Sequence, residues 1–527
     1  MKYDVTVITT IHAEGRILHR TFRALNRSVD YARQKGVSIE ILCILDNCSD
    51  PITRNIVKNW QQKFEDRISV VNVEYGAVAD ARNFGVSQAR GEYIALLDGD
   101  DLFAEKLLFR SYQACLQDKK VIAHPEAEYL FPVEPFLRFY FADNESFLNL
   151  IYSNIFTVRT MAHRDVYLNV PSVRNTDVWA FQDWLWHCDA AVRGYRHQIV
   201  PGTIIAVRQK PFAKSLWQNN VARNKVIRPN DLFRQIFCLK FNRPEYRDDS
   251  TCKQGIRLLE RSVISLLDEC YCKNPTAYQF IIGLKRKVWS SFNKFFRKSL
   301  QNWILEEIEL LAEIEPALSN FRNPTVRFTD THRRFFNVIN KEMSLLVQAK
   351  KPKIFILQDL SPESWNAFKS SNHEATGNVF LITTHSFAQR HKGGNNPALV
   401  HIDIGNTNLI FEERLNLLHR LLLETEPEFI HIIGSHIAFE MLDRYRATFQ
   451  NMNVIATLLS PSPNPTKGFS RSGLNWELCK YPNLTDFIDQ IQTDSNEHKG
   501  RIHEIYGQDN TSIITCKKAE GISAYEE

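Results

Sequence analysis

The sequence predicts an α/β protein in which two α/β regions flank a helical region. Strand and helix patterns alternate over the first part of the chain, long helical patterns dominate from about residue 225 to 350, and the alternation returns from Lys353 onward. A chain of 527 residues is too long for one compact core, so two or three domains are expected. We expect domains at residues 1–224, 225–350 and 351–527.

The first region is predicted to contain a parallel sheet covered on both faces, because its strand patterns are almost continuously apolar. Ligands of such sheets bind beyond the carboxyl ends of the strands. The predicted strands are Tyr3–Thr10, Ile39–Leu45, Ile68–Val73 and Glu92–Leu97, and the predicted helices cover 16–35, Pro51–Phe64 and Ala77–Ala89.

The middle region is predicted to be helical and the last region to be a second α/β domain. The helical patterns are Ile256–Leu267, Trp303–Leu318 and Arg333–Val347. The strands of the last region are expected at Ile354–Leu357, Val379–Thr383, Leu399–Ile404, Phe429–Ile433, Val454–Leu458 and Ser512–Cys516, with helices near 412–424 and 436–450. A Pro-rich stretch, SPSPNPTKG at 460–468, predicts a surface loop.

Composition excludes several classes of protein. An apolar fraction of 44% and a charged fraction of 24% are those of an ordinary globular protein. The net charge of +5 is weak for this length, so no nucleic-acid partner is expected. The ten cysteines form no CxxC pair, which predicts free thiols in a reducing compartment. We see no signal peptide and no apolar run of the roughly 18 residues that span a bilayer, and we expect a cytoplasmic protein.

The stretch LLDGDDLF, at 96–103, places three carboxylates directly after the fourth predicted strand. Asp98, Asp100 and Asp101 would repel one another unless a positive charge lay between them. Hard carboxylate oxygens suit Mg²⁺ or Mn²⁺, and such ions keep positions for substrate phosphates. The alternative is a solvated acidic loop that caps a helix starting at 102–105.

The segments around this stretch resemble the family 2 glycosyltransferases, whose catalytic domain has the GT-A fold, a Rossmann-like nucleotide-diphospho-sugar transferase fold. The resemblance is carried in order by VTVITTIHAEG, ILCILDNCSDPIT, GAVADARNFG and ARGEYIALLDGDD, and it continues in AFQDWLWHCDAAVRGYRHQIVPG and VRQKPFAKSLW. It covers roughly residues 3–217. Each motif is loose, but several in sequence are specific.

The resemblance implies the roles of individual residues. Asp46 matches the acid that holds the uracil or ribose of a nucleotide, and Asp183 matches the general base. Asp98 and Asp100 match the metal-binding pair of the Asp-x-Asp motif, with Asp100 the more direct ligand. The full donor-binding set is Thr9, Thr10, Glu14, Asp46, Arg82, Asp98 and Gly99. The implied ligands are Mn²⁺ or Mg²⁺ and a nucleotide-diphosphate sugar, with a UDP-sugar favoured.

The sequence departs from the family pattern at three positions. Gln182 stands where the family has an acid before the base, and Asn47 and Cys48 replace the second Asp and the Gly of the nucleotide turn. These changes leave the nucleotide and the sugar open. They do not alter the expected reaction, which is a transfer with inversion at the anomeric carbon to a glycan or lipid-linked glycan.

Several of these side chains also have simpler interpretations. Asp183 could cap the helix that follows it, and Arg82 could pair with Glu92. His187 or His197 could complete a metal shell, but packing against aromatic rings is the commoner role and the one we favour. The tryptophans Trp184, Trp186 and Trp217 could line a sugar platform or belong to the core.

Two downstream segments bear on partners. The basic segment 283–303, GLKRKVWSSFNKFFRKSLQNW, could lie on an anionic membrane at its inner face, or pack its aromatic stripe on the first domain, which we favour. Residues 353–517 loosely resemble the N-terminal, Rossmann-like half of a GT-B glycosyltransferase. The second half of a GT-B enzyme is not expected here. This domain is therefore either a module for acceptor binding or for assembly with partner glycosyltransferases, or one half of an enzyme.

We therefore expect a metal-dependent, inverting glycosyltransferase of bacterial surface polysaccharide synthesis, such as capsule or O-antigen. The alternatives are a non-catalytic glycan-binding or scaffold protein with a degenerate transferase domain, and a nucleotidyltransferase. The latter would normally carry a Gly-rich basic loop after the first strand, and IHAEGR is a poor match.

Overall fold

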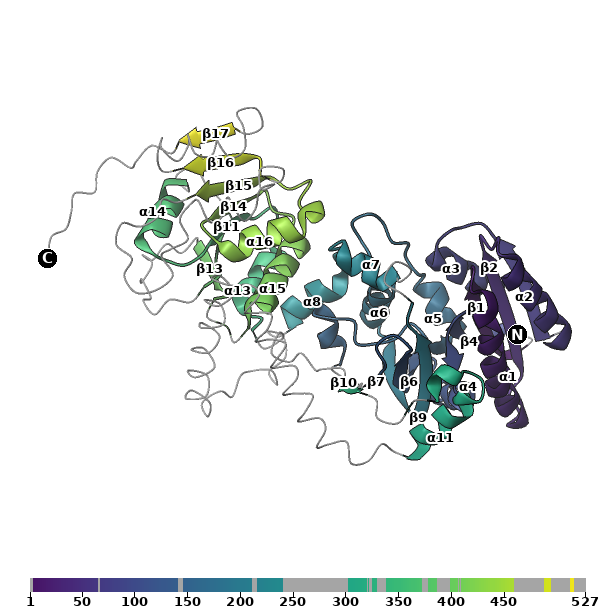
Figure 1. Ribbon diagram of the computed structural model, residues 1–527. Helices are drawn as coiled ribbons and strands as arrows, with labels where there is room; N and C mark the ends of the chain where they lie inside the picture. Colours follow the sequence, from purple (N-terminus) through teal and green to yellow (C-terminus); the bar gives the residue numbers. More distant parts are fainter. Residues whose placement is uncertain are drawn as a thin grey trace, which may run out of the picture. The chain divides into compact units, whose positions relative to one another are not determined.

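The chain forms two compact units in a computed structural model (Figure 1). The first consists of residues 1–232 and 283–332, and the second of residues 233–282 and 333–527. The structure describes residues 3–64, 67–140, 146–210, 216–239, 302–319, 321, 325–328, 338–371, 378–385, 399–405, 407, 409–458, 488–493 and 512–515. The pattern at Ile256–Leu267, most of the basic segment 283–303 and the loop 460–468 lie outside these residues. The domain boundaries expected from the sequence stay predictions.

The first unit is built on a ten-stranded mixed sheet whose path runs β10-β7-β6-β8-β4-β1-β2-β3. The four strands expected from the sequence are confirmed as the parallel block β3-β2-β1-β4. Beyond β4, the strand β8 runs antiparallel to both β4 and β6, and β9 runs parallel to β6. The strands are β1 Tyr3–Ile11, β2 Ile39–Asp46, β3 Ile68–Val73, β4 Gly91–Asp98, β5 Leu102–Phe103, β6 Val121–Phe131, β7 Phe136–Phe139, β8 Met161–His163, β9 Arg196–Arg208 and β10 Thr325–Phe328.

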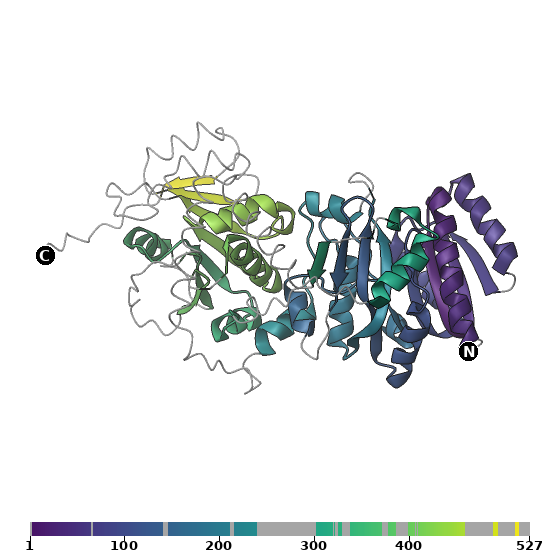
Figure 2. The ribbon, with the colours of Figure 1, turned by 60° about the horizontal axis from the view of Figure 1, so that its bottom comes forward.

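Helices cover both faces of this sheet, because successive side chains of a strand point to opposite faces. On β2, Ile41 and Cys43 join a cluster with Phe22 and Trp60, which lie on neighbouring helices (Figure 2). Leu42 and Ile44 of the same strand join the opposite cluster. The helices are α1 Leu18–Gln34, α2 Pro51–Phe64, α3 Val78–Gln88, α4 Leu107–Gln117, α5 Arg164–Asn169, α6 Gln182–Val192 and α7 Leu216–Ala222, with short 3-10 turns at Gly15–Ile17 and Ser146–Ile151. The expected coverage on both faces is confirmed.

A segment distant in the sequence completes the first unit. Helix α11 (Asn302–Ala312) and the turn η7 (Pro316–Leu318) bury apolar side chains against β6 and β9. Glu315, whose side chain is 1% exposed, forms ion pairs with Arg20 at 2.7 Å and with Arg208. The helical pattern at Trp303–Leu318 is thus an α-helix that ends at Ala312 and a 3-10 turn after it.

The second unit contains a seven-stranded sheet in which every pairing is parallel. Its order is β13-β12-β11-β14-β15-β16-β17, so the chain moves outward from the centre in one direction and then in the other, as in a doubly wound Rossmann sheet. The strands are β11 Lys353–Leu357, β12 Val379–Thr383, β13 Leu399–Asp403, β14 Phe429–Ile433, β15 Val454–Leu458, β16 Gln490–Thr493 and β17 Ser512–Thr515. The expected second α/β sheet is present, and its strand β16 was not expected.

The helices of the second unit depart from the sequence patterns at their ends. Of the pattern at Arg333–Val347, residues 333–337 lie outside the described part of the chain. Helix α13 begins at Lys341, where the Asn340 side chain accepts from the backbone N–H of Met343 and caps the helix. The pattern near 436–450 ends as α-helix at Arg444 and continues as a short 3-10 turn. The helices are α8 Asp231–Leu239, α13 Lys341–Gln348, α14 Pro362–Ser371, α15 Phe411–Glu424 and α16 His436–Arg444, with the 3-10 turn Arg446–Thr448.

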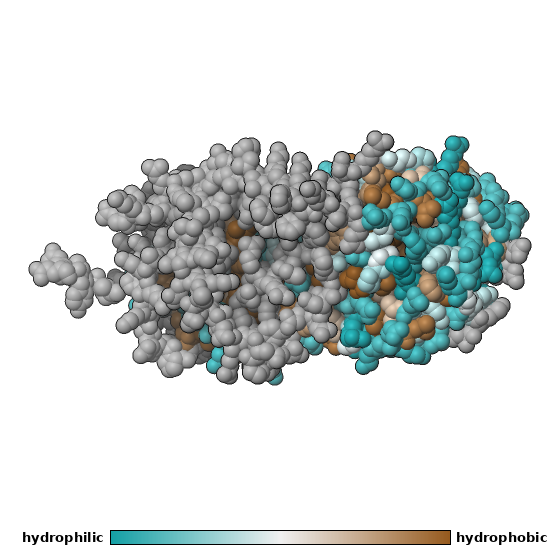
Figure 3. Space-filling model, turned by 90° about the horizontal axis from the view of Figure 1, so that it is seen from below, coloured by the Kyte–Doolittle hydropathy of each residue, from teal (hydrophilic) through white to brown (hydrophobic). Residues whose placement is uncertain are grey.

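Two expectations about the whole chain can be compared with the described residues. Among the helices in these ranges, none combines the length and apolar character that crossing a bilayer requires. The described cysteines Cys43, Cys48, Cys115, Cys188 and Cys238 are free thiols, as expected. In the view of Figure 3, the first unit shows apolar residues as separate patches among hydrophilic side chains.

Candidate functional site

The acidic turn, Asp98–Asp101, follows β4 at the carboxyl edge of the parallel block. Thr10 of β1 lies opposite Asp98, and the Gly99 N–H donates to the Thr10 carbonyl at 3.0 Å. A side chain at Gly99 would come within 3.1 Å of that carbonyl oxygen and 3.3 Å of the Glu14 side chain. Only glycine allows this approach without displacement. The structure therefore brings together Thr10, Glu14, Asp98 and Gly99, as the sequence predicts.

Three basic side chains of this chain lie between the carboxylates. Arg82 donates to Asp98 Oδ1 at 2.6 Å, and Arg159 lies 3.1 Å from Asp98 Oδ2. Arg159 Nε also donates to Asp101 Oδ2 at 2.7 Å, and Lys210 Nζ lies 2.9 Å from Asp100 Oδ2. The acidic turn is thus stabilised by ion pairs even before any ligand is considered.

Arg159 was not identified from the sequence. It belongs to none of the motifs, and it lies 58 residues beyond Asp101 in the loop before β8. Its guanidinium is near a third acid, with Nη1 3.9 Å from Glu128. A local sequence pattern carries no signal for such a long-range contact.

The ion pairs set the charge of Asp98. Burial alone would raise the pKa of Asp98, but the charges of Arg82 and Arg159 outweigh it and hold that pKa below its usual range. Burial disfavours the charged form of Arg159, yet Asp101 and Asp98 raise its pKa well above the ordinary value. Asp98 and Arg159 are therefore both ionised at neutral pH.

Two of the simpler interpretations are not what the structure shows. Arg82 pairs with Asp98, whereas Glu92 pairs with Lys119 at 2.9 Å. No helix starts at 102–105: Leu102–Phe103 is the short strand β5, and α4 begins at Leu107. The acidic turn is thus not a helix cap.

Asp46 ends β2 at the same sheet edge, where its carboxylate orders the segment between β3 and α3. Oδ1 accepts from the backbone N–H groups of Tyr75 at 2.7 Å and Gly76 at 2.9 Å, and Oδ2 accepts from Ala77 at 3.0 Å. Gly76 has a positive φ of 63°, which a glycine adopts without strain. The predicted nucleotide acid thus shapes the loop that would border the nucleotide.

Thr9 and Glu14 complete the predicted donor-binding set. The Glu14 carboxylate accepts from the backbone N–H of His12 at 2.7 Å, and burial raises the pKa of Glu14 despite that bond. Thr9 is fully buried in β1 between the neighbouring strands, and its hydroxyl has no hydrogen-bond partner among the described residues. Glu14 is therefore close to the acidic turn, while Thr9 lies beneath it in the sheet.

Asp183 lies in the first turn of α6, where a negative charge is stabilised by the helix dipole. Its Oδ2 accepts from the Asn154 side chain at 3.0 Å. Burial raises the pKa of Asp183, and the charges of Arg82 and Arg159 act in the opposite direction. The two guanidiniums that hold Asp98 therefore also act on Asp183, which links the two parts of the site electrostatically.

The tryptophans near this helix are held by hydrogen bonds to the backbone. Trp186 is buried and donates to the Val170 carbonyl at 2.7 Å, and Trp184 donates to the Leu150 carbonyl at 2.7 Å. Trp186 belongs to the core, as one of the two sequence interpretations holds. The side chain of Trp217 and residues 211–215 lie outside the described part of the chain.

Comparison with known proteins identifies the family of the first region. Residues 6–147 match the model of glycosyl transferase family 2. The minor teichoic acid biosynthesis protein GgaB of Bacillus subtilis is 30% identical over 104 residues, which cover 20% of this chain and 11% of GgaB. Glycosyltransferase GlyG of Streptococcus pneumoniae is 31% identical over 110 residues, which cover 21% of this chain and 34% of GlyG. This chain thus spans only a minor part of these relatives.

Among solved structures, S. aureus TarS 1-349 in complex with UDP-GlcNAc matches over 60% of this chain and 81% of the TarS chain. With 12% identity and a TM-score of 0.31, this likeness is too distant to place any residue. The mixed sheet of the first unit is nevertheless typical of the GT-A fold, and the family match falls on its parallel block. Residues 6–147 of this chain are therefore a family 2 glycosyltransferase domain.

Proposed function

We propose that this chain is a metal-dependent, inverting glycosyltransferase that moves a sugar from a nucleotide-diphosphate sugar to a glycan or lipid-linked glycan. The observation that supports this most is the shared electrostatics of Asp98, which lies in the region that matches family 2, and Asp183, which lies beyond that region. The same guanidiniums, Arg82 and Arg159, act on both carboxylates. A UDP-sugar is the favoured donor, because Asp46 matches the family's uracil- or ribose-binding acid.

The acidic turn fits a divalent cation through Asp100. Both oxygens of Asp98 are engaged by guanidinium groups, whereas Asp100 is paired with Lys210, whose side chain is 46% exposed. An exposed lysine can move away from its partner at little cost. Two carboxylates at a strand end are the hard donors that Mn²⁺ or Mg²⁺ prefers. When bound, the cation would neutralise charge on the diphosphate leaving group.

Asp183 is the proposed general base. It removes the proton of the acceptor hydroxyl as that oxygen forms a bond to the anomeric carbon and the bond from this carbon to the diphosphate oxygen breaks. Attack opposite the leaving group inverts the anomeric centre. Because burial raises the pKa of Asp183, this pKa is closer to that of an efficient general base at neutral pH. The Asn154 side chain orients the carboxylate.

The nucleotide is proposed to lie along the sheet edge formed by β1, β2 and β4. Asp46 holds the loop after β3, Thr10 and Glu14 line the edge, and Gly99 packs closely against both of them. The Arg82 guanidinium, which donates to Asp98 in this structure, could donate to a phosphate oxygen of the bound nucleotide instead.

A role in bacterial surface polysaccharide synthesis, such as capsule or O-antigen, is proposed from the relatives. GgaB is named for teichoic acid biosynthesis, and a lipid-linked acceptor would place this chain at the inner face of the membrane. The parallel sheet of the second unit then serves acceptor binding or assembly with partner glycosyltransferases.

A non-catalytic scaffold is the second candidate, favoured by one observation. Each carboxylate of the acidic turn already has a basic partner, so the turn is stable as an ion-pair network. A degenerate transferase domain would keep such a network without using a metal.

Nucleotide release distinguishes these candidates. The purified chain is incubated with UDP-, GDP- and dTDP-sugars, with water and glycan fragments as acceptors, in Mn²⁺, Mg²⁺ or EDTA. We expect nucleoside diphosphate to be released from one donor class only when metal is present. Failure to release it from any donor in any metal supports the scaffold, and pyrophosphate formed from a nucleoside triphosphate and a sugar phosphate supports a nucleotidyltransferase.

A further inference from the structure

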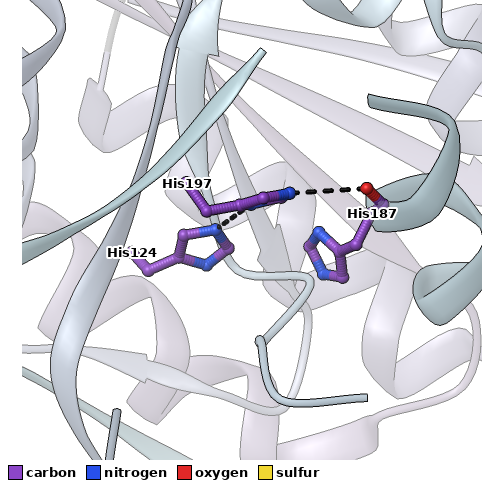
Figure 4. Close-up of side chains that lie close together, drawn as sticks. All are labelled: His124, His187 and His197. Atoms are coloured by element: carbon purple, nitrogen blue, oxygen red, sulfur yellow. Dashed lines mark hydrogen bonds between the residues drawn. The ribbon is translucent and has the colours of Figure 1, made fainter. Parts of the chain in front are cut away.

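Three histidines from separate elements meet inside the first unit. His124 lies on β6, His187 on α6 and His197 on β9, and their rings face one another (Figure 4). One ring nitrogen from each lies within 4.8 Å of those of the other two. His124 and His187 are fully buried. We call this group the histidine triad.

The triad is incompletely hydrogen-bonded for so buried a site. His124 Nε2 and His197 Nδ1 share a hydrogen bond at 2.8 Å, and His197 Nε2 is 3.4 Å from the His187 carbonyl oxygen. Among the described residues, His124 Nδ1 and both ring nitrogens of His187 form no hydrogen bond of ordinary geometry, although the Thr157 backbone acts on both rings. Buried polar atoms without partners are rare in folded proteins, and those that occur call for an explanation such as a bound water or ion.

The rings are also held in fixed positions. Phe156 stacks on His124 with centroids 4.8 Å apart and on His197 with centroids 4.2 Å apart.

We propose that His124, His187 and His197 bind one Zn²⁺ ion. Three imidazoles are an established donor set for zinc, and they leave a fourth position for a water molecule. Zn–N bonds of about 2.0–2.1 Å require the ring nitrogens to lie roughly 3.4 Å apart, so small shifts of the three rings are needed. Binding replaces the hydrogen bond between His124 and His197 and gives a ring nitrogen of His187 a direct bond to the metal.

The site has a consequence for α6. His187 lies four residues after Asp183 on this helix, so the two side chains are one turn apart on the same face. A metal shared by α6, β6 and β9 would fix the helix against the sheet and so hold Asp183 in place. The zinc site is separate from the acidic turn and does not depend on transferase activity.

The test uses the full chain without an affinity tag, stripped with a chelator and titrated with Zn²⁺ against a chromophoric competitor. We expect one tight site per chain, a rise in the unfolding temperature on adding Zn²⁺, and visible absorption typical of tetrahedral nitrogen-ligated Co²⁺ when Co²⁺ is added instead. His187→Gln should weaken Zn²⁺ binding by more than about 100-fold, since even indirect partners of a metal contribute 10- to 100-fold.

Two controls show which site is measured. His431→Gln alters an equally buried histidine of the second sheet, which bonds to Thr457 at 2.8 Å, and should leave zinc affinity unchanged. Asp100→Ala removes a carboxylate of the acidic turn and should also leave it unchanged. Two results would overturn the proposal. One is that the wild-type chain binds no Zn²⁺ tightly, and the other is that tight binding is lost in Asp100→Ala. The wild-type titration decides whether the site exists, so the test remains valid even if His187→Gln fails to fold.

Discussion

Replacing Asp183 with Asn lowers the rate of nucleotide release from the donor sugar by about 10²- to 10⁴-fold, the usual contribution of a general base. Asparagine has nearly the same shape and can still bond to Asn154, but it cannot accept the acceptor proton. Affinity for the nucleotide should change little, because Asp183 is proposed to act on the acceptor and not on the donor. The measurement is a comparison of kcat with the dissociation constant of the nucleoside diphosphate.

The pH dependence provides an independent check on this base. Activity requires the ionised carboxylate, so it is lost as pH falls through the pKa of Asp183. Because burial raises that pKa, the acid limb of kcat should lie at a higher pH than for an ordinary aspartate. Asp189→Asn, on the same helix, is the matched control and should keep normal activity. Full activity in Asp183→Asn would contradict the assignment.

Replacing Arg159 with Met destabilises the first unit by about 3–5 kcal/mol, the range for breaking a buried ion pair from one side. The guanidinium contacts Asp98 at 3.1 Å and Asp101 at 2.7 Å, and Asp101 is almost fully buried. Methionine fills a similar volume, so the loss reflects charge more than a cavity. The free energy of unfolding from urea titration measures the effect.

A double substitution separates charge from packing at this position. In Arg159→Met combined with Asp101→Asn, the buried carboxyl group that loses its guanidinium partner is also replaced, and the total loss should be smaller than the sum of the single losses. Arg196→Met breaks an exposed pair with Asp118 and should leave the free energy of unfolding almost unchanged. If Arg159→Met is no more harmful than Arg196→Met, the acidic turn does not depend on the ion pairs described above.

Local patterns predicted the parallel strands well. Ile68–Val73, Val379–Thr383, Phe429–Ile433 and Val454–Leu458 begin and end where expected. The three strands of the second sheet among these are buried along nearly all of their length, so each is a predominantly apolar run between polar turns. The position of the acidic turn at a carboxyl strand edge follows from the same pattern.

The antiparallel half of the first sheet was not predicted. Strand β6 contains Pro125 next to a break in its register with β9, and β9 includes Pro201 and Gly202. Proline and glycine within a short stretch of sequence predict a loop, and these segments are extended only because they pair with distant strands. The strand β16, Gln490–Thr493, is short and polar and carries no apolar run of its own.

Contacts over long sequence distances account for what was missed at the sites. Arg159 reaches the acidic turn from another part of the chain, and His124 lies 73 residues before His197. The sequence points to His187 and His197 only because they lie within the segment Ala180–Gly202 that resembles the family's base region. Their association with His124 depends on the parallel pairing of β6 with β9.

The most direct test of the central claim is the binding of UDP to the full chain with Mn²⁺, with EDTA, and in Asp100→Ala. A ligand at about 100 times its dissociation constant adds about 2.7 kcal/mol of stability, which a thermal-shift titration detects readily. We expect UDP to stabilise the wild-type chain only with the metal, and to lose this effect in Asp100→Ala. No stabilisation of wild type by UDP or any other nucleoside diphosphate, or equal stabilisation in EDTA and in Asp100→Ala, would contradict a metal-dependent nucleotide-sugar site at the acidic turn.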